Sequence, residues 1–291
     1  MAEALYHPEL GYYTRPGAQP FGPEGDFYTA TQVQPVFGRL VAQLVKQCGE
    51  EHFIDWGAGA EALRPFFGSY TAVDARRGAL PDRFRGFVFA NELFDALPVD
   101  VFVRRDGVWV ERRVTFQHGE FAWMDDGAPS QAQSEWLARY ALDQENFIIE
   151  VNLEADRMLA ELASRMESGW LLAIDYGVTR RELIRFPEGT LMSYRRHAAS
   201  DGVLDSPGDH DLTAHVHFDA LRASAQAHGF REERFESMAS LLLRAGEADR
   251  FASVLDSPEP MAAGLRMQLK TLLFGMGETF RAVMWRREKA L

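Results

Sequence analysis

The stretch FIDWGAGAEALRPFF, residues Phe53–Phe67, decides the fold class. It consists of a short apolar run, a turn that contains Gly57 and Gly59, and a segment of helical composition. A buried strand that enters a glycine turn and then a helix begins a doubly wound sheet, in which ligands bind at the carboxyl ends of the strands. A connection that is merely rich in glycine gives the same pattern, so this motif alone leaves both interpretations open.

Several further apolar runs follow, each ending in acidic or small polar residues. They are SYTAVDA (69–75), GFVFANELF (86–94), NFIIEVN (146–152) and WLLAIDYG (170–177). Runs of this length are typical of parallel strands that are buried on both faces. Residues 153–168 form an amphipathic helical pattern before the last of these runs, which gives a βαβ rhythm. The sequence therefore predicts an α/β protein with a doubly wound, mostly parallel, Rossmann-like sheet.

Other segments depart from this rhythm. Residues 99–123 contain VFVRRDGVWVERRV, whose alternation about Asp106-Gly107 predicts a hairpin. Helices are expected at 33–45, 218–228 and 237–245, and the last strand at 272–285. Residues 1–30 are rich in turns and in aromatic side chains, so we expect this N-terminal arm to pack against the rest of the protein. We predict one domain, 1–291, divided into arm and first helix (1–48), cofactor-side half (49–98), hairpin insertion (99–145) and second half of the sheet (146–291).

Composition limits the classes of function. The 291-residue chain is 46% hydrophobic and carries a formal net charge of −12. This charge repels phosphate backbones and anionic lipid, so neither nucleic acid nor membrane is an expected partner. Cys48 is the single cysteine, which excludes an intrachain disulfide and fits a reducing cytoplasm. The N-terminus lacks the pattern of an export signal, and no apolar run reaches the roughly 20 residues that span a bilayer.

Acidic and glycine residues at the first two strand ends predict a cofactor site. Asp55, Gly57 and Gly59 lie where the turn of a nucleotide-binding sheet requires them, and Asp74 follows the second strand as a ribose-hydroxyl acceptor or a helix N-cap. Glu61 stands where a dinucleotide fingerprint has its third glycine. A carboxylate there repels a pyrophosphate, which disfavours NAD, whereas S-adenosylmethionine has a cationic sulfonium and no phosphate.

The third strand end is the most polar. Asn91, Glu92 and Asp95 follow directly on an apolar run, where burial is costly unless the side chains meet a ligand or a partner group. The alternative interpretation is a helix cap with a loop carboxylate. His210, His215 and His217 lie close together further on, but their spacing does not match a zinc helix, so we expect no metal site.

The sequence resembles the MidA family. The motifs that carry the resemblance are YHPELGYY (Tyr6–Tyr13), GDFYTA (Gly25–Ala30), ANELFDALPV (Ala90–Val99), LLAIDYG (Leu171–Gly177), GTLMSYRRH (Gly189–His197), PGDHDLTAHVHF (Pro207–Phe218) and MGETFR (Met276–Arg281). They occur in the family's order and cover nearly the whole chain. The segments on either side of Asp74 are short for the family, which predicts that a helix and an edge strand are missing.

The resemblance implies a class I methyltransferase fold and S-adenosyl-L-methionine as cofactor. It also implies methylation of an arginine in a protein substrate, since mitochondrial members methylate a respiratory complex I subunit during its assembly. Within the matching motifs, Gly25 and Thr29 join the expected cofactor-binding residues. The family pattern at the first strand has a glycine where this chain has Glu61, so the turn is altered.

A guanidinium is protonated at physiological pH, so carboxylates must hold it and accept its charge as the proton leaves. Glu92 is the expected catalytic carboxylate, with Asp95 or Asp26 in support. Asn91 is expected to contact the amino-acid end of the cofactor or the substrate, and His215 to hydrogen-bond on the substrate side. Two alternatives stay open: a non-catalytic assembly or interaction protein on a degenerate methyltransferase fold, and, with less support, an NAD-dependent dehydrogenase.

Overall fold

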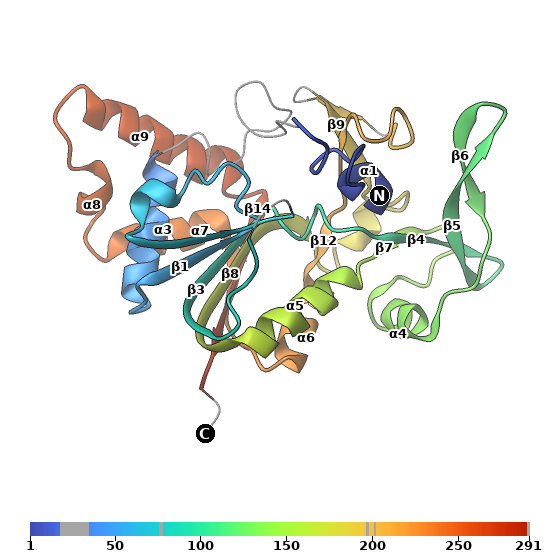
Figure 1. Cartoon of the computed structure of the whole chain (residues 1–291), viewed down its shortest axis with the longest axis horizontal. Coiled ribbons are helices and arrows are strands. Elements are labelled where there is room, and N and C mark those ends of the chain that lie inside the picture. Colours follow the sequence, from blue (N-terminus) through green and yellow to red (C-terminus); the bar gives the residue numbers. More distant parts are fainter. Residues whose placement is uncertain (18–34, 76–77, 196–197, 201, 290–291) are drawn as a thin grey trace. The chain divides into compact units, whose positions relative to one another are not determined.

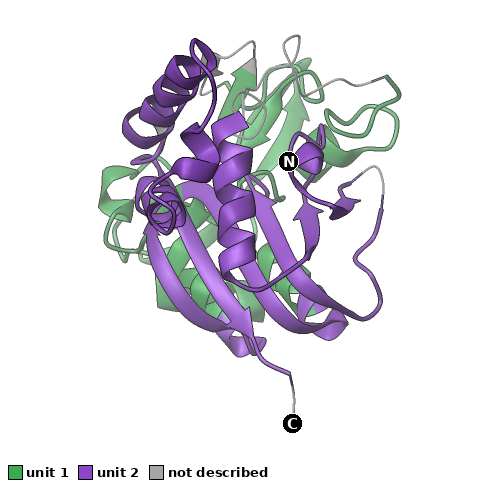
Figure 2. Ribbon diagram, turned by 90° about the vertical axis from the view of Figure 1, so that its left-hand side faces the viewer, with its two compact units in different colours: residues 1–20, 94–160, 177–225 green, residues 21–93, 161–176, 226–291 purple. Residues whose placement is uncertain are grey.

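The computed structural model describes residues 1–17, 35–75, 78–195, 198–200 and 202–289. The chain divides into two compact units, which Figure 2 colours separately. Unit 1 comprises residues 1–20, 94–160 and 177–225, and unit 2 comprises residues 21–93, 161–176 and 226–291. This division does not test whether residues 1–291 fold as one domain, which stays a prediction.

A mostly parallel sheet organises unit 2, with strands in the order β13-β14-β8-β3-β1-β2 (Figure 1). The strands are β1 (His52–Trp56), β2 (Ser69–Val73), β3 (Phe84–Asn91), β8 (Met166–Val178, whose last two residues belong to unit 1), β13 (Arg231–Ser237) and β14 (Phe280–Arg287). β1 lies parallel to β2 and β3, and β3 lies parallel to β8. β14 lies antiparallel to β8 and β13. The predicted Rossmann-like α/β sheet is confirmed.

The core of unit 2 explains why these apolar runs became strands. Phe53, Phe87 and Phe89 are fully buried and pack with a helical layer on one face of the sheet. Ile54 and Val88, which follow Phe53 and Phe87 in the sequence, are fully buried as well. Because successive strand residues point to opposite faces, burial of all of them means that both faces are covered. The helical layer is made of α3 (Pro35–Gln47), α7 (Met238–Glu247), α8 (Ala252–Leu255) and α9 (Met261–Thr271).

The sheet ends at β2 on one side. Only residues 74–83 separate β2 from β3, and within the described part of unit 2 no strand pairs with the free edge of β2. A crossover between parallel strands takes a dozen or more residues, so this connection is too short to hold a further strand and helix. The predicted loss of an edge strand is confirmed for the described residues.

The prediction of a helix after the glycine turn is wrong. Residues 57–63 form successive turns, and only the three-residue 3-10 helix η1 (Arg64–Phe66) follows. Glu61 has a φ of 55°, which lies outside the right-handed helical region. Pro65 lacks a backbone N–H and disfavours helical conformation in the residue before it. With β2 starting at Ser69, too few residues are left for a longer helix.

Other element boundaries also differ from the expected ones. The helix predicted over 153–168 is α5 (Glu154–Arg165), and residues 166–168 belong to β8 instead. Residues 272–285 do not form one strand: Leu272–Met276 is a π-helical turn, η3, that extends α9, and β14 begins at Phe280. The helices expected at 218–228 and 237–245 are confirmed as α6 (Phe218–Ala227) and α7. The helix expected at 33–45 begins at Pro35 in the described residues.

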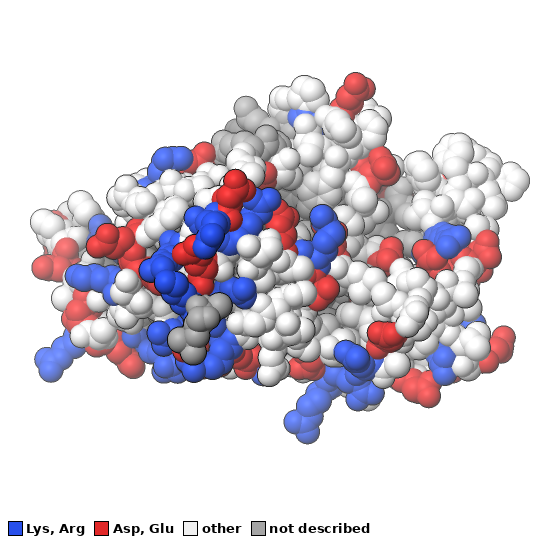
Figure 3. All heavy atoms as spheres, turned by 60° about the horizontal axis from the view of Figure 1, so that its bottom comes forward, with Lys and Arg blue, Asp and Glu red and all other residues white. Residues whose placement is uncertain are grey.

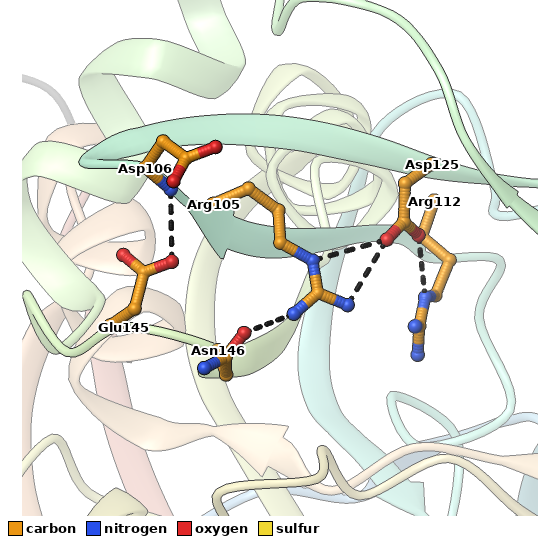
Figure 4. A network of polar contacts seen from close by, with 6 residues as sticks. All are labelled: Arg105, Asp106, Arg112, Asp125, Glu145 and Asn146. Carbon is orange, nitrogen blue, oxygen red and sulfur yellow. Dashed lines mark hydrogen bonds and ion pairs between the residues drawn. The ribbon is translucent and has the colours of Figure 1, made fainter.

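Unit 1 contains the predicted hairpin as part of an antiparallel sheet in the order β6-β5-β4-β7. Its elements are β4 (Asp100–Arg105), β5 (Val108–Gln117), β6 (Glu120–Asp125), α4 (Gln131–Tyr140) and β7 (Ile148–Val151). Asp125 accepts hydrogen bonds from Arg105 and Arg112, and Glu145 accepts from the backbone N–H of Asp106 (Figure 4). Glu145 also accepts from the backbone N–H of Gly107. These bonds fix the turn of the hairpin and the register of its strands.

The prediction of a parallel strand at residues 146–152 is wrong. These residues were expected in the parallel sheet, but β7 pairs antiparallel with β4, with Ile149 opposite Phe102. Its continuous burial has a different cause: Phe102 and Ile149 pack with Trp136 of α4, while Ile148 packs with Val101 and Val103 on the other face. A strand buried on both faces has the same sequence pattern in either kind of sheet.

The N-terminal arm packs within unit 1, as predicted for its described part. Leu5 of α1 (Ala2–Tyr6) and Tyr12 are buried against Leu212 of the short strand β11 (Asp211–Thr213). β11 pairs with β9 (Met192–Arg195), which also pairs with β10 (Ala198–Ser200), and β12 (Val216–His217) pairs with the end of β8. The aromatic side chains therefore serve as packing groups for residues 1–17.

The surface carries charges of both signs. Figure 3 shows one face on which Lys and Arg are interspersed with Asp and Glu. In unit 2, Arg83 and Arg85 both pair with Glu167, at 2.6 and 3.4 Å. Such exposed pairs contribute little to stability. Among the described residues, no helix is both long enough and apolar enough to cross a membrane.

Candidate functional site

The carboxyl ends of β1 and β2 bring three predicted residues of unit 2, Asp55, Gly57 and Asp74, together. The N–H groups of Gly57 and Ala58 both donate to the carbonyl oxygen of Val73, at 2.7 and 3.2 Å. These bonds hold the glycine turn beside Asp74, and the carboxylates of Asp55 and Asp74 lie close enough to affect each other electrostatically. The parallel register that pairs β1 with β2 is the reason for this proximity.

Gly57 and Gly59 meet a backbone requirement. Their φ angles are 88° and 50°, a region that residues with a Cβ adopt at a cost. A Cβ on Gly57 would also lie 3.1 Å from Cδ1 of Leu93, so a side chain here would fill the space above the turn. The positive φ and the contact with Leu93 both favour glycine at position 57, and the binding of a ligand by this turn stays a prediction.

Asp55 is the most perturbed carboxyl of this site. It is buried, and burial raises its pKa to about 6, with the Glu61 and Asp74 carboxylates acting in the same direction. The Tyr70 hydroxyl donates a 2.5 Å hydrogen bond to Asp55 Oδ2, which partly opposes the shift. Tyr70 was not among the residues predicted for this site. Only the register of β2 on β1, which periodicity does not give, places it beside Asp55.

This pKa predicts a pH-dependent gain in stability for Asp55→Asn. Because the folded-state pKa of about 6 lies above the ordinary 3.8, Asp55 stabilises the fold most at low pH, and this contribution is lost as pH rises through 6. A shift of about two units corresponds to about 3 kcal/mol. We expect the free energy of unfolding of Asp55→Asn, relative to wild type, to rise by about that amount between pH 4 and 7. Urea titrations across this range measure it.

The control for that titration is Asp82→Asn, since the Asp82 side chain is 99% exposed. Its difference from wild type should not follow the same curve. A stability difference for Asp55→Asn that stays constant from pH 4 to 7 would contradict the burial of a carboxyl with a raised pKa.

Glu61 changes the sequence-based argument about NAD. It adopts a left-handed φ of 55°, and its carboxylate pairs with Arg64 at 2.6 Å. The Arg64 guanidinium also lies 4.8 Å from the centre of the Tyr70 ring. This ion pair weakens the repulsion that Glu61 exerts on a pyrophosphate, so Glu61 disfavours NAD less strongly than the sequence indicated. Arg64 was not among the residues predicted for this site either.

Asn91 and Glu92 form the polar end of β3. Glu92 N–H donates to the Ile174 carbonyl at 2.9 Å, so pairing with β8 continues through Glu92, although this residue has a left-handed φ of 50°. Asn91 Nδ2 donates to Glu92 Oε1 at 2.9 Å. Asn91 Oδ1 is buried and has no hydrogen-bond partner among the described residues. A buried acceptor without a hydrogen-bond partner is typical of a site where a ligand donates the missing hydrogen bond.

The remaining predicted residues belong to unit 1 or fall outside the described residues. Asp95 and His215 belong to unit 1, whereas Asn91 and Glu92 belong to unit 2. Gly25, Asp26 and Thr29, expected near the cofactor or substrate, lie outside the described residues. Within the ranges that the structure describes, no group of three or more His, Cys, Asp or Glu is placed to hold a metal ion.

His215 is held by a buried network in unit 1. Its backbone N–H donates to Thr190 Oγ1 at 3.0 Å, and that hydroxyl donates to Glu150 Oε2 at 2.9 Å. Glu150 also accepts from the N–H groups of Thr190 and Leu191, at 2.8 and 3.2 Å. Burial raises the pKa of Glu150 and lowers that of His215. The network fixes the position of the His215 segment, and burial favours the neutral imidazole.

Thr190→Val should therefore destabilise the protein. Valine removes the hydroxyl that links Glu150 to the His215 backbone, and leaves buried polar groups without partners, at a cost of about 1–3 kcal/mol. Urea unfolding at pH 7 measures the loss. Thr115→Val in β5, where no hydrogen bond of the threonine hydroxyl is formed within the described residues, should change stability by less than about 0.5 kcal/mol. Equal effects of the two substitutions would contradict the network.

The sheet order, the glycine turn and the strand-end carboxylates define a Rossmann-like protein of the class that binds nucleoside-containing cofactors. A family model for S-adenosyl-L-methionine-dependent methyltransferases matches residues 68–235. The chain belongs to this methyltransferase family. This finding confirms the class that the MidA resemblance implied and the cofactor that the family uses.

The chain is similar to mitochondrial proteins. It is 27% identical to "Protein arginine methyltransferase NDUFAF7 homolog, mitochondrial" of Drosophila melanogaster, with 79% of this chain and 66% of the relative covered. It is also 27% identical to "Protein arginine methyltransferase NDUFAF7, mitochondrial" of Danio rerio, over 77% of this chain and 67% of the relative. The chain thus spans about two thirds of the length of these relatives.

A solved structure resembles nearly the whole chain. It is a Burkholderia thailandensis protein bound to S-adenosylhomocysteine, with a TM-score of 0.83 and 27% identity, and the match covers 98% of this chain and 86% of that one. A second crystal structure from Burkholderia thailandensis gives the same TM-score and identity. These likenesses confirm the methyltransferase fold for this chain.

Proposed function

We propose that the protein transfers a methyl group from S-adenosyl-L-methionine to an arginine of a protein substrate. The observation that carries the proposal is the arrangement of Asp55, Gly57 and Asp74, which the pairing of β1 with β2 brings together in unit 2. The relatives named protein arginine methyltransferases support arginine as the acceptor. The MidA resemblance makes a respiratory complex I-type subunit the first protein substrate to try.

In this proposal Asp74 accepts hydrogen bonds from the ribose hydroxyls, and the Gly57–Gly59 turn lets the backbone approach the cofactor. The buried Asn91 Oδ1 accepts from the ammonium of its amino-acid end. Gly25 and Thr29 remain proposed cofactor contacts on sequence grounds. When bound, S-adenosyl-L-methionine supplies an electrophilic methyl group on a cationic sulfur.

Glu92 is proposed to hold and orient the guanidinium. Its carboxylate accepts one hydrogen bond from Asn91, which fixes its direction, and the other oxygen can accept from a guanidinium N–H. Glu92 would accept the N–H proton that the methylated guanidinium loses, so that the charge of the acceptor stays at +1 through the transfer. Orientation of the acceptor nitrogen is the main catalytic contribution in such a reaction. Asp95, Asp26 and His215 are proposed to support Glu92 on the substrate side.

A second candidate is a non-catalytic interaction protein on this fold. The short sheet favours it, since within the described residues no strand lies beyond β2 and only η1 connects β1 to β2. Tritiated S-adenosyl-L-methionine separates the two candidates when it is incubated with the protein and an array of arginine-containing peptides. Label that hydrolysis recovers as methylarginine supports the enzyme. Binding of S-adenosylhomocysteine without any transfer supports the non-catalytic protein.

A further inference from the structure

A face of the short strand β11 in unit 1 carries buried polar groups that the proposed mechanism does not use. Asp211 and Thr213 are 1% and 2% exposed. Since alternate residues of a strand share a face, their side chains lie on the same side of β11. β11 pairs antiparallel with β9, and Tyr194 stands directly opposite Asp211 on that face.

The N-terminal arm adds two phenols to this face. The Tyr13 hydroxyl is hydrogen-bonded to the Asp211 carboxylate, and its ring stacks on that of Tyr6, with centroids 5.7 Å apart at 25°. Burial, followed by the charge of Asp211, raises the pKa of both tyrosines. Both phenols therefore stay protonated and neutral at physiological pH.

Asp95 brings a second carboxylate to the same place. It is 3% exposed, and its carbonyl oxygen accepts from Ala214 N–H at 2.9 Å, directly after β11. After burial, Asp95 and Asp211 both raise the pKa of Tyr194, and both also raise that of Tyr13. Two carboxylates therefore share one set of aromatic neighbours. We call Asp95, Asp211, Thr213, Tyr13 and Tyr194 the acidic tyrosine cluster.

An independent observation indicates a ligand for this cluster. Thr213 Oγ1 is buried and has no hydrogen-bond partner among the described residues, although it lies on the same strand face as Asp211. Burying a hydroxyl that has no hydrogen-bond partner costs free energy unless a ligand or another group forms a hydrogen bond with it. A guanidinium has five N–H donors in one plane, forms paired bonds to carboxylates and stacks on aromatic rings. Its chemistry matches each member of the cluster.

We propose that the acidic tyrosine cluster binds the protonated guanidinium of an arginine side chain. This rests on the proposed function, because the guanidinium bound here belongs to a second arginine of the same protein substrate, whose acceptor arginine Glu92 is proposed to hold. Asp95 and Asp211 bind the N–H groups, Thr213 Oγ1 accepts a further one, and the tyrosine rings flank the plane of the cation. These residues all belong to unit 1 and position the substrate, and none of them is a proposed cofactor-binding residue.

The test is an NMR titration of the full chain with N-acetyl-L-arginine N-methylamide. Its neutral isostere, the citrulline derivative, is the control ligand. Wild type should bind the arginine derivative at least about tenfold more tightly than the citrulline one. Asp211→Asn should weaken arginine binding about tenfold, and Asp209→Asn, at an exposed carboxylate paired with Arg15, should leave it unchanged. Thr213→Val should weaken it about threefold and decides the matter if Asp211→Asn does not fold.

Binding of S-adenosylhomocysteine, measured on the same samples, should be equal in all of these variants. Normal cofactor binding with no preference of wild type for arginine over citrulline would overturn the inference and leave the proposed function standing. Equal arginine affinity in wild type and in folded Asp211→Asn and Thr213→Val would also overturn it. Failure of wild type to bind S-adenosylhomocysteine would instead contradict the proposed function, and the inference would fall with it.

Discussion

Gly57→Arg is expected to weaken binding of S-adenosylhomocysteine by about a hundredfold or more, which corresponds to about 3 kcal/mol. The substitution places a long side chain above the turn at the end of β1. The first atom of that side chain, Cβ, already lies 3.1 Å from Leu93. The φ of 88° adds backbone strain at the same point. Isothermal titration calorimetry measures the loss.

Gly49→Arg is the matched control. Gly49 also has a positive φ, of 73°, but a Cβ there meets no atom within 4 Å. This variant should carry a similar backbone strain of about 1 kcal/mol and bind S-adenosylhomocysteine as wild type does. If Gly57→Arg folds and keeps wild-type affinity, the turn does not hold the cofactor.

Glu92→Gln is expected to lower methyl transfer by about a hundredfold or more while leaving cofactor binding within about twofold of wild type. Glutamine keeps the size of the side chain and can accept the hydrogen bond from Asn91, so the local structure should persist. It lacks the negative charge that holds a guanidinium and balances its charge during transfer. The peptide-array assay with tritiated S-adenosyl-L-methionine gives the rate.

The control for this variant is Glu51→Gln, which changes an exposed carboxylate before β1 and should leave the rate unaltered. Full turnover by Glu92→Gln would remove Glu92 from the mechanism. Loss of cofactor binding together with activity would give Glu92 a role in shaping the cofactor site, since its φ of 50° already marks an unusual backbone at the end of β3.

The strands of the central sheet were predictable because burial on both faces leaves a continuous apolar run. β1, β3 and β8 were found in this way, which placed Asp55 and Asn91 near the ends of the first two. The same signal failed for β7, because a strand buried between α4 and other side chains of unit 1 has the same composition as a parallel one. Composition reports burial and does not report the pairing partner.

The helix predicted after the glycine turn does not form, and the reason is local. Residues 60–67 have helical composition, but the left-handed Glu61 and the restricting Pro65 leave room for η1 only. The substitution of Glu61 for a family glycine was visible in the sequence. Its φ of 55° shows that the backbone kept the conformation that a glycine adopts easily.

Contacts over long sequence distances could not be predicted. Tyr70 reaches Asp55 through the register of two strands, and Tyr13 reaches Asp211 across nearly two hundred residues. β11 is three residues long and has no periodicity to reveal which side of it is buried. The acidic tyrosine cluster therefore emerges only when the arm, β9 and β11 are seen together in unit 1.

The turn from Asp55 to Glu61, with Asp74 and Asn91, is inferred to bind the adenosine and amino-acid groups that S-adenosyl-L-methionine and S-adenosylhomocysteine share. Calorimetric titration of the wild-type chain with S-adenosylhomocysteine, and in parallel with NAD, tests it most directly. We expect saturable binding of S-adenosylhomocysteine at one site, with NAD bound at least about a hundredfold more weakly. No heat with S-adenosylhomocysteine, or tighter binding of NAD, would contradict it.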